Sequence, residues 1–237
     1  MKKKILAAFM AAAMVAGMSA INVAAEEEGG DVITVGFSQV GAESDWRTAN
    51  TESMQTTFSE ENGYELIFSD AQQKQENQLT AVRNFIQQEV DYILLAPVTE
   101  TGWDTVLQEA KDAGIPVIIV DRMVDVSDDS LYTTWIGTDS LLEGRKAAEW
   151  LNAYATAKEI APEDLHIVDI QGTIGSTAQI GRTQGLEEGV EKYGWDLLEQ
   201  QSGEFTQAKG QEVMESMLKK YDNINVVYCE NDNEAFG

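Results

Sequence analysis

The sequence has little of the chemistry on which most enzymes and metalloproteins depend. Its 237 residues contain one cysteine and one histidine. The single cysteine, Cys229, excludes an internal disulfide, so packing must stabilise the fold. The single histidine, His166, excludes the usual zinc sites, which need several histidines or cysteines. Both residues fall within predicted strands, where we expect structural roles. The sequence therefore predicts no catalytic residue, no metal site and no cofactor.

Basic residues are also scarce, with 16 lysines and arginines against 41 aspartates and glutamates and a net charge of −25. Such a charge argues against a nucleic acid partner, because phosphates attract basic proteins. The acidic loop at residues 125–129 could hold calcium. It lacks the glycine and the distal glutamate of the known calcium loop, so a solvated loop is the preferred interpretation. No segment is rich in proline or serine, and a flexible linker is not expected.

The chain has one long apolar stretch, at its N-terminus. Lysines at positions 2–4 precede an apolar segment at residues 5–20, and Val23, Ala24 and Ala25 follow it. The segment is too short and interrupted for the 18 or more apolar residues of a membrane span. We therefore predict a cleaved signal peptide at residues 1–25 and a periplasmic or other extracytoplasmic location. An uncleaved N-terminal anchor is the alternative. No cysteine follows the segment, which argues against a lipid-modified N-terminus.

Short apolar runs alternate with amphipathic stretches along the rest of the chain. The runs at residues 32–37, 64–68, 92–96, 117–120, 166–170 and 224–228 resemble strands buried on both faces. Apolar residues recur at helical spacing between several of them. This alternation predicts an α/β fold with parallel sheets flanked by helices.

The alternation restarts after an extended segment at residues 131–138. We therefore predict two α/β lobes, an N-terminal lobe at residues 31–134 and a C-terminal lobe at residues 135–237. A cleft between the lobes would hold the ligand.

Two glycine motifs could indicate a nucleotide site, and both fail. Gly36 and Gly41 have the spacing of a phosphate-binding loop, but Ala42 and Glu43 follow where lysine and then serine or threonine are required. Gly172 and Gly175 lack the first half of the dinucleotide-binding motif. We therefore predict that the protein is not an enzyme.

Polar side chains follow the predicted strands at their carboxyl ends, where open α/β sheets bind ligands. Asp121 and Arg122 follow one strand, and Trp46 lies in the loop after the first. A sugar hydroxyl both donates and accepts hydrogen bonds, so it can bond to arginine and aspartate together, while an indole ring covers an apolar face. The alternatives are that Asp121 and Arg122 pair with each other and that Trp46 belongs to the core.

Several longer strings carry a resemblance to a known family. They are GFSQVGAESDWR at 36–47, DAQQKQENQ at 70–78, APVTETGW at 96–103, IPVIIVDR at 115–122, QGTIGSTAQIGR at 171–182 and SGEFTQAKGQEVMES at 202–216. The chain resembles the galactofuranose-binding components of bacterial ABC sugar importers, within the ribose/galactose type of periplasmic binding proteins. The resemblance implies a two-lobed fold that captures a neutral monosaccharide for an ABC transporter permease, and a monomer is expected.

The resemblance also implies which residues bind the sugar. Those expected to contact the ligand are Glu43, Ser44, Asp45, Trp46, Arg47, Asp121, Arg122, Arg182, Phe205 and Asn231. Asp45 and Gly181 depart from the family pattern. Relatives carry an acid just before Arg182, so the resemblance implies that one hydroxyl partner is missing here.

Other interpretations remain open. The same fold serves as the sensor of sugar-responsive repressors, which need an N-terminal helix-turn-helix where this chain has its signal peptide. A binding partner of a chemoreceptor and a secreted carbohydrate-active enzyme are further alternatives. The family pattern continues beyond Gly237, so we expect the second lobe to be incomplete and this stretch alone to bind sugar weakly.

Overall fold

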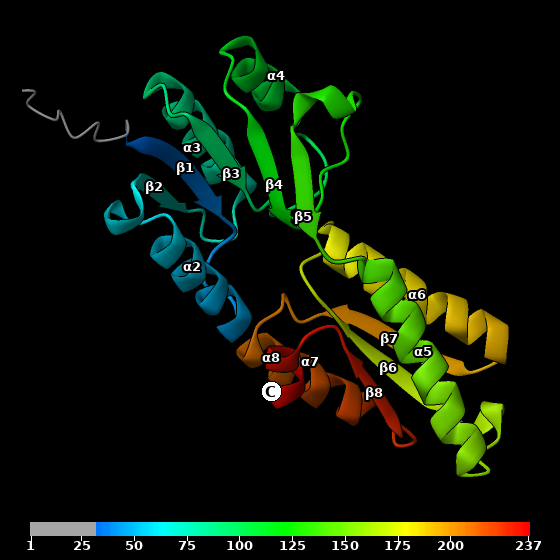
Figure 1. The fold of residues 1–237 in the computed structure, drawn as a ribbon. Helices are drawn as coiled ribbons and strands as arrows, with labels where there is room; N and C mark the ends of the chain where they lie inside the picture. The colour runs from blue at the N-terminus through cyan, green and yellow to red at the C-terminus, as the bar shows by residue number, and fades with distance from the viewer. Residues whose placement is uncertain (1–31) are drawn as a thin grey trace, which may run out of the picture. The chain divides into compact units, whose positions relative to one another are not determined.

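Two parallel sheets form the centre of the computed structural model, which describes residues 32–237 (Figure 1). Residues Ile33–Gly237 form one compact unit. The predicted signal peptide lies outside the described residues. Within the described residues, no helix is long and apolar enough to span a membrane.

Sheet A has five strands in the order β2-β1-β3-β4-β5. They are β1 (Ile33–Gln39), β2 (Tyr64–Asp70), β3 (Tyr92–Leu95), β4 (Val117–Asp121) and β5 (Thr134–Gly137), and every pairing is parallel. Its helices are α2 (Asp45–Thr57), α3 (Gln75–Gln87) and α4 (Asp104–Asp112). Parallel pairing requires a crossover between successive strands, and the amphipathic stretches supply it.

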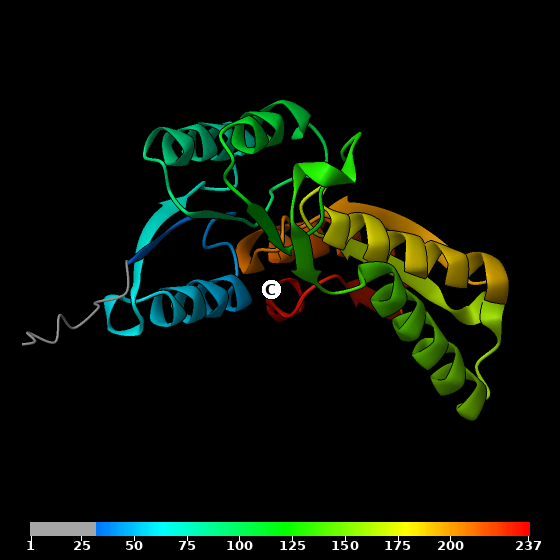
Figure 2. The ribbon, with the colours of Figure 1, turned by 45° about the horizontal axis from the view of Figure 1, so that its top comes forward.

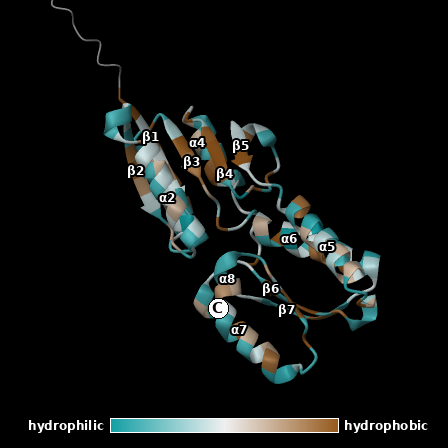
Figure 3. Ribbon diagram, turned by 60° about the horizontal axis from the view of Figure 1, so that its bottom comes forward, coloured by the Kyte–Doolittle hydropathy of each residue, from teal (hydrophilic) through white to brown (hydrophobic). Residues whose placement is uncertain are grey.

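The two faces of sheet A are covered by different helices. Side chains of α3 and α4, among them Phe85 and Leu107, pack with Ile93 and Ile119 in one apolar core. Met54 of α2 packs against the other face. Figure 2 shows α3 and α4 on one side of this sheet and α2 on the other, and Figure 3 shows hydrophobic residues along β3 and β4. Burial on both faces explains why these strands consist of continuous apolar runs.

Sheet B has three strands in the order β7-β6-β8. They are β6 (His166–Gln171), β7 (Asp196–Ser202) and β8 (Val226–Cys229), with helices α5 (Ser140–Ala157), α6 (Thr177–Tyr193), α7 (Gln207–Lys220) and α8 (Asp232–Phe236). Ile167 and Val168 are adjacent in β6 and enter different cores, the first with α5 and α6 and the second with α7. The α/β prediction with parallel sheets and flanking helices is thus confirmed.

The apolar runs do not reveal two strands, β5 and β7. Both are edge strands that are only partly buried, so polar residues can occupy them. The lobe boundary predicted between residues 134 and 135 falls inside β5, which pairs with β4 in sheet A. A division after Gly137 fits this pairing better, and the two-lobe organisation stays a prediction.

Glycines bring α5 and α6 unusually close together. A Cβ atom added to Gly185 would lie 2.5 Å from the backbone nitrogen of Arg145, and one added to Gly144 would lie 2.6 Å from the carbonyl oxygen of Arg182. Neither position has room for a side chain. Figures 1 and 2 show the two helices side by side. Their backbones therefore approach at a distance that only glycine permits.

Candidate functional site

A cavity of about 500 Å³ lies at the carboxyl ends of strands from both sheets. Ligands bind at this end of the strands in open α/β proteins. The lining residues come from the start of α2, the end of β4, the first turns of α5 and α6, the loop after β7, and the segment around the end of β8. They are Glu43, Ser44, Asp45, Trp46, Arg47, Asp121, Arg122, Thr138, Glu143, Ala147, Ala178, Arg182, Phe205, Tyr228, Cys229, Glu230, Asn231, Asp232, Asn233 and Phe236.

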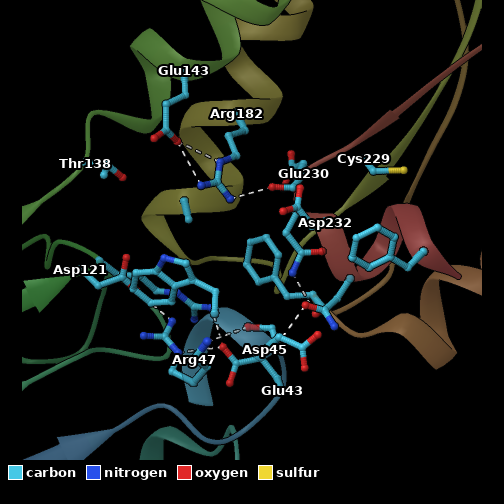
Figure 4. A pocket seen from close by; sticks show the side chains of 18 of the residues that line it. Glu43, Asp45, Arg47, Asp121, Thr138, Glu143, Arg182, Cys229, Glu230 and Asp232 are labelled. Carbon is cyan, nitrogen blue, oxygen red and sulfur yellow. Dashed lines mark hydrogen bonds and ion pairs between the residues drawn. The ribbon is translucent and has the colours of Figure 1, made fainter. Parts of the chain in front are cut away.

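All ten ligand-contact residues predicted from the sequence line this cavity. They come from five separate stretches of the chain, so the fold brings together residues up to 188 positions apart (Figure 4). Their contact with a ligand stays a prediction. The predicted contacts do not include three acids of the wall, Glu143, Glu230 and Asp232.

The first turn of α2 holds one charged pair in place. Ser44 caps the helix, because its hydroxyl accepts a hydrogen bond of 3.2 Å from the backbone nitrogen of Arg47. One turn apart, Arg47 Nε donates to Glu43 Oε1 at 2.9 Å. The side chains of Glu43 and Arg47 are 1% and 3% exposed, so this is a buried ion pair. Capping and pairing together fix the guanidinium against the cavity.

The aspartate and arginine at the end of β4 complete the same network. Asp121 Oδ2 lies 2.8 Å from Arg47 Nη2, and Arg122 Nη2 lies 3.6 Å from Glu43 Oε1. Arg122 also donates to the carbonyl oxygen of Val98 at 3.0 Å. Asp121 and Arg122 thus pair with residues of the first loop and not with each other. The alternative that they form a local pair is wrong.

The network leaves two buried polar atoms without a partner among the described residues. They are Glu43 Oε2, an acceptor, and Arg47 Nη1, a donor. Buried polar atoms of this kind normally find a partner, because an unmade hydrogen bond costs about 1–3 kcal/mol. Both belong to residues that line the cavity. A group that donates and accepts would satisfy them together.

Burial weakens the basicity of one member of the network. Arg122 is fully enclosed, and desolvation, assisted by the nearby positive charge of Arg47, lowers its pKa to about 10. Glu43 and Asp121 act in the opposite direction. The guanidinium therefore remains protonated near neutral pH and keeps its donor character.

An aromatic ring occupies the middle of the cavity wall. The Phe205 ring centre lies 5.1 Å from the guanidinium carbon of Arg122 and 5.9 Å from that of Arg182. Gly172 lies directly against the ring, since a Cβ atom there would overlap it. The backbone φ of Phe205 is +62°, a strained value for a residue with a side chain. The ring is therefore held between two cations and a glycine.

Trp46 and Asp45 lie closer to solvent. Trp46 is 55% exposed, and its ring centre lies 4.8 Å from the guanidinium carbon of Arg47. It does not belong to the core, so that alternative is wrong. The backbone nitrogen of Asp45 donates to Asn233 Oδ1 at 3.2 Å. This bond joins the starts of α2 and α8.

Arg182 anchors the wall contributed by sheet B and its helices. Its Nε and Nη2 atoms donate to Glu143 Oε2 at 3.1 and 3.0 Å, and its Nη1 donates to the carbonyl oxygen of Glu230 at 2.7 Å. Asn231 lies beside this group. Its amide donates to the carbonyl oxygen of Phe205 and its Oδ1 accepts from the backbone nitrogen of Glu234, so it also caps α8.

Three acids in β6 and in the segment after β8 are buried. Burial raises the pKa of Glu230 to about 8, that of Glu234 to about 7 and that of Asp169 to about 7. Glu230 accepts from the backbone nitrogen of Gly172, and Glu234 accepts from that of Phe205. The loops after β6 and β7, which contain Gly172 and Phe205, are therefore each hydrogen-bonded to an acidic side chain from the segment after β8.

Comparisons with known proteins show which family the chain belongs to. Residues 35–237 match the model of the periplasmic binding protein domain. The chain belongs to the periplasmic binding protein domain family. The resemblance drawn from the sequence strings is confirmed.

Members of the periplasmic binding protein family with named ligands are similar to this chain. The galactofuranose-binding protein YtfQ of Escherichia coli is 44% identical over 95% of this chain and 68% of its own length. A crystal structure of a galactofuranose binding protein superimposes with a TM-score of 0.80 at 45% identity, over 86% of this chain and 68% of that one. The binding protein of the arabinose ABC transporter of Shewanella sp. ANA-3, bound to L-arabinofuranose, gives a TM-score of 0.79 at 48% identity, over 86% and 66%.

All three relatives are named as sugar-binding proteins, and this chain spans about two thirds of their length. One of them is the periplasmic binding protein component of an arabinose ABC transporter. The single histidine and the single cysteine are unsuited to catalysis at this cavity. His166 stands at the first residue of β6, away from the cavity, and bonds to Asp196 at 3.1 Å. Cys229 lines the cavity, but burial raises its pKa to about 11, so it stays a thiol.

Among residues 32–237 no group of three or more acids, histidines or cysteines could hold a metal ion. In the acidic loop, Asp128 instead accepts from the backbone nitrogen of Ser130 and lies 3.7 Å from Lys111. This agrees with the interpretation of a solvated loop.

Proposed function

We propose that this protein captures an uncharged furanose-type monosaccharide, such as galactofuranose, outside the cytoplasm and delivers it to an ABC transporter permease. The observation that carries the proposal is the pair of unpartnered atoms in the buried network, Glu43 Oε2 and Arg47 Nη1. A sugar hydroxyl donates to the first and accepts from the second, and charge-assisted bonds of this kind contribute about 1.5–3 kcal/mol each.

The charges of the cavity favour a ligand without charge. Each lining guanidinium already lies beside a carboxylate: Arg47 and Arg122 beside Glu43, and Arg182 beside Glu143. An ionised ligand would add an unpaired charge to a partly buried site, which is costly. The rings of Phe205 and Trp46 offer faces for the apolar C–H groups of a sugar.

The furanose form and the role in import come from the relatives. Proteins 44–48% identical to this chain are described as binding galactofuranose or arabinofuranose. On this basis we propose the ten predicted residues as the ligand contacts. We further propose a secreted monomer without enzymatic activity, freed from residues 1–25 by cleavage before Glu26. N-terminal sequencing of the secreted protein tests the cleavage site.

A thermal-shift series tests the function. The full-length secreted protein is heated with D-galactose, L-arabinose, D-fructose and D-ribose, and with galacturonate as a charged control. A sugar present at 100 times its Kd raises the unfolding free energy by about 2.7 kcal/mol, and so raises the Tm. We expect a shift with at least one neutral sugar and none with galacturonate. Sugar recovered unchanged after incubation supports binding without catalysis. Absence of any shift contradicts the proposal.

A further inference from the structure

The cavity has a second acid–arginine pair, Glu143 and Arg182, on the wall opposite Glu43 and Arg47 (Figure 4). Arg182 uses three of the five N–H groups of a guanidinium, two toward Glu143 and one toward Glu230. Both bonds to Glu143 end on the same oxygen, Oε2. Glu143 Oε1 makes no hydrogen bond to any residue in 32–237, and its side chain is 40% exposed.

This second pair therefore repeats the chemistry of the first. In each pair one carboxylate oxygen is occupied by the arginine, and the other oxygen and part of the guanidinium are unused. A hydroxyl that donates to the free oxygen of Glu143 and accepts from a free N–H of Arg182 completes both groups. Such a hydroxyl would belong to a different part of the ligand from the one that meets Glu43 and Arg47.

The position of Glu143 depends on the close contact of α5 and α6. A Cβ atom added to Gly181 would lie 2.7 Å from the backbone nitrogen of Leu141 and 2.9 Å from the Cβ atom of Ser140. With no side chain at position 181, the first turn of α5 packs directly on α6. Glu143, in that turn, then reaches Arg182 on the neighbouring helix. Position 181, just before Arg182, thus has no acidic side chain, and Glu143 of α5 places a carboxylate beside Arg182.

We infer that Glu143 is a specificity-determining residue of the cavity, one that contacts a hydroxyl of the bound sugar directly. This inference rests on the proposed function and deepens it. It means that the protein distinguishes sugars by a hydroxyl on the side of the ligand that faces α5, in addition to the hydroxyls read by the first loop.

Substitutions in both the protein and the ligand distinguish direct contact between Glu143 and a sugar hydroxyl from an indirect effect of Glu143 on the position of Arg182. Titration calorimetry on the full-length protein compares D-galactose and L-arabinose with deoxy analogues that each lack one hydroxyl, for the unmodified protein and for Glu143→Ala. We expect Glu143→Ala to lower the affinity for the parent sugar at least tenfold. For the analogue that lacks the contacted hydroxyl, we expect the same substitution to change affinity less than twofold, because the interaction is already gone.

A matched control lies on the same two helices. Arg145 of α5 bonds to Glu188 of α6 at 2.9 Å, and the Glu188 side chain is 39% exposed but does not line the cavity. Glu188→Ala should leave sugar affinity within twofold. The inference is wrong, and the proposed function stands, if Glu143→Ala leaves sugar affinity within twofold as this control does. The same holds if Glu143→Ala lowers the affinity for every analogue by the same factor. If the unmodified protein binds neither the parent sugars nor the analogues, both are wrong.

Discussion

A carboxylate oxygen of Glu234 accepts a hydrogen bond of 2.9 Å from the backbone nitrogen of Phe205, 29 residues earlier in the chain. The acceptor lies in α8 and the donor in the loop after β7, so the bond joins two elements around the cavity. Phe205 has a strained backbone, and strain of this kind persists only where neighbouring groups enforce it. The aromatic wall is therefore built by several distant residues together.

Substitution of Gly172 by alanine should displace the aromatic ring. The added methyl group would overlap the ring of Phe205, whose backbone is held by Glu234. We expect sugar affinity to fall at least tenfold and the free energy of unfolding to fall by about 1–3 kcal/mol, as overpacking typically costs. Calorimetry and urea unfolding measure the two effects. Gly114→Ala is the control: its backbone φ of +75° makes alanine unfavourable, but it lies in open space far from the ring. Equal affinity loss in both variants would contradict the argument.

Removal of Asp121 or Arg122 should weaken binding by at least tenfold each. Asp121→Ala deprives Arg47 of a partner at 2.8 Å, and Arg122→Ala deprives the Phe205 ring of its closer cation. Each loss leaves buried groups unpaired at about 1–3 kcal/mol. Titration calorimetry with the best neutral sugar measures the change. The exposed pair of Arg83 and Glu109 is the control, and Glu109→Ala should leave both the sugar affinity and the stability essentially unchanged. Unchanged affinity in both site variants would place the ligand elsewhere.

Stability should fall as the pH rises through neutrality. Burial raises the pKa of Asp169 from 3.8 to about 7. Between these values the folded protein binds more protons than the unfolded chain, so the free energy of unfolding decreases with rising pH. The contribution of Asp169 is complete below pH 3.8 and lost above about pH 7. We expect a lower Tm at pH 8 than at pH 6.

Asp169→Asn tests the origin of this dependence. The amide oxygen can still accept from Gln200, which bonds to the aspartate at 3.1 Å, and no charge has to be buried. We expect the variant to be more stable than the unmodified protein at pH 8, by at least about 1 kcal/mol, and to have a flatter pH profile. An unchanged profile would show that Asp169 is already ionised in the folded protein.

Gly185→Ala should separate α5 from α6. The new methyl group would meet the backbone of Gly144 and Arg145, which cannot rotate away as a side chain can. We expect destabilisation of about 1–3 kcal/mol or more by chemical unfolding. Ala148, which lies on the same face of α5, is buried and close to Gly189. Ala148→Gly is the control, because it removes a methyl group from the same interface. It should lower the free energy of unfolding by only about 1 kcal/mol, owing to the lower helix propensity of glycine. Full stability of Gly185→Ala would contradict the close packing.

The sequence by itself determined the α/β class, since burial on both faces forces the inner strands to be continuous apolar runs. It also indicated Asp121, Arg122 and Trp46, because ligands of open α/β sheets bind at the carboxyl ends of the strands. The resemblance to the family supplied the other seven residues. β5 and β7 do not stand out as apolar runs, because both are only partly buried, although the sequence indicates an extended segment at residues 131–138 around β5.

Only the tertiary structure decided which charged groups pair. Sequence neighbours such as Asp121 and Arg122 turn toward different partners, and Arg182 pairs with Glu143, 39 residues away. The contribution of Glu143 follows from the absence of side chains at Gly181 and Gly185. The role of these glycines depends on the distance between the backbones of α5 and α6. The order of residues along the chain does not specify that distance, so only the tertiary structure shows why a side chain is absent there.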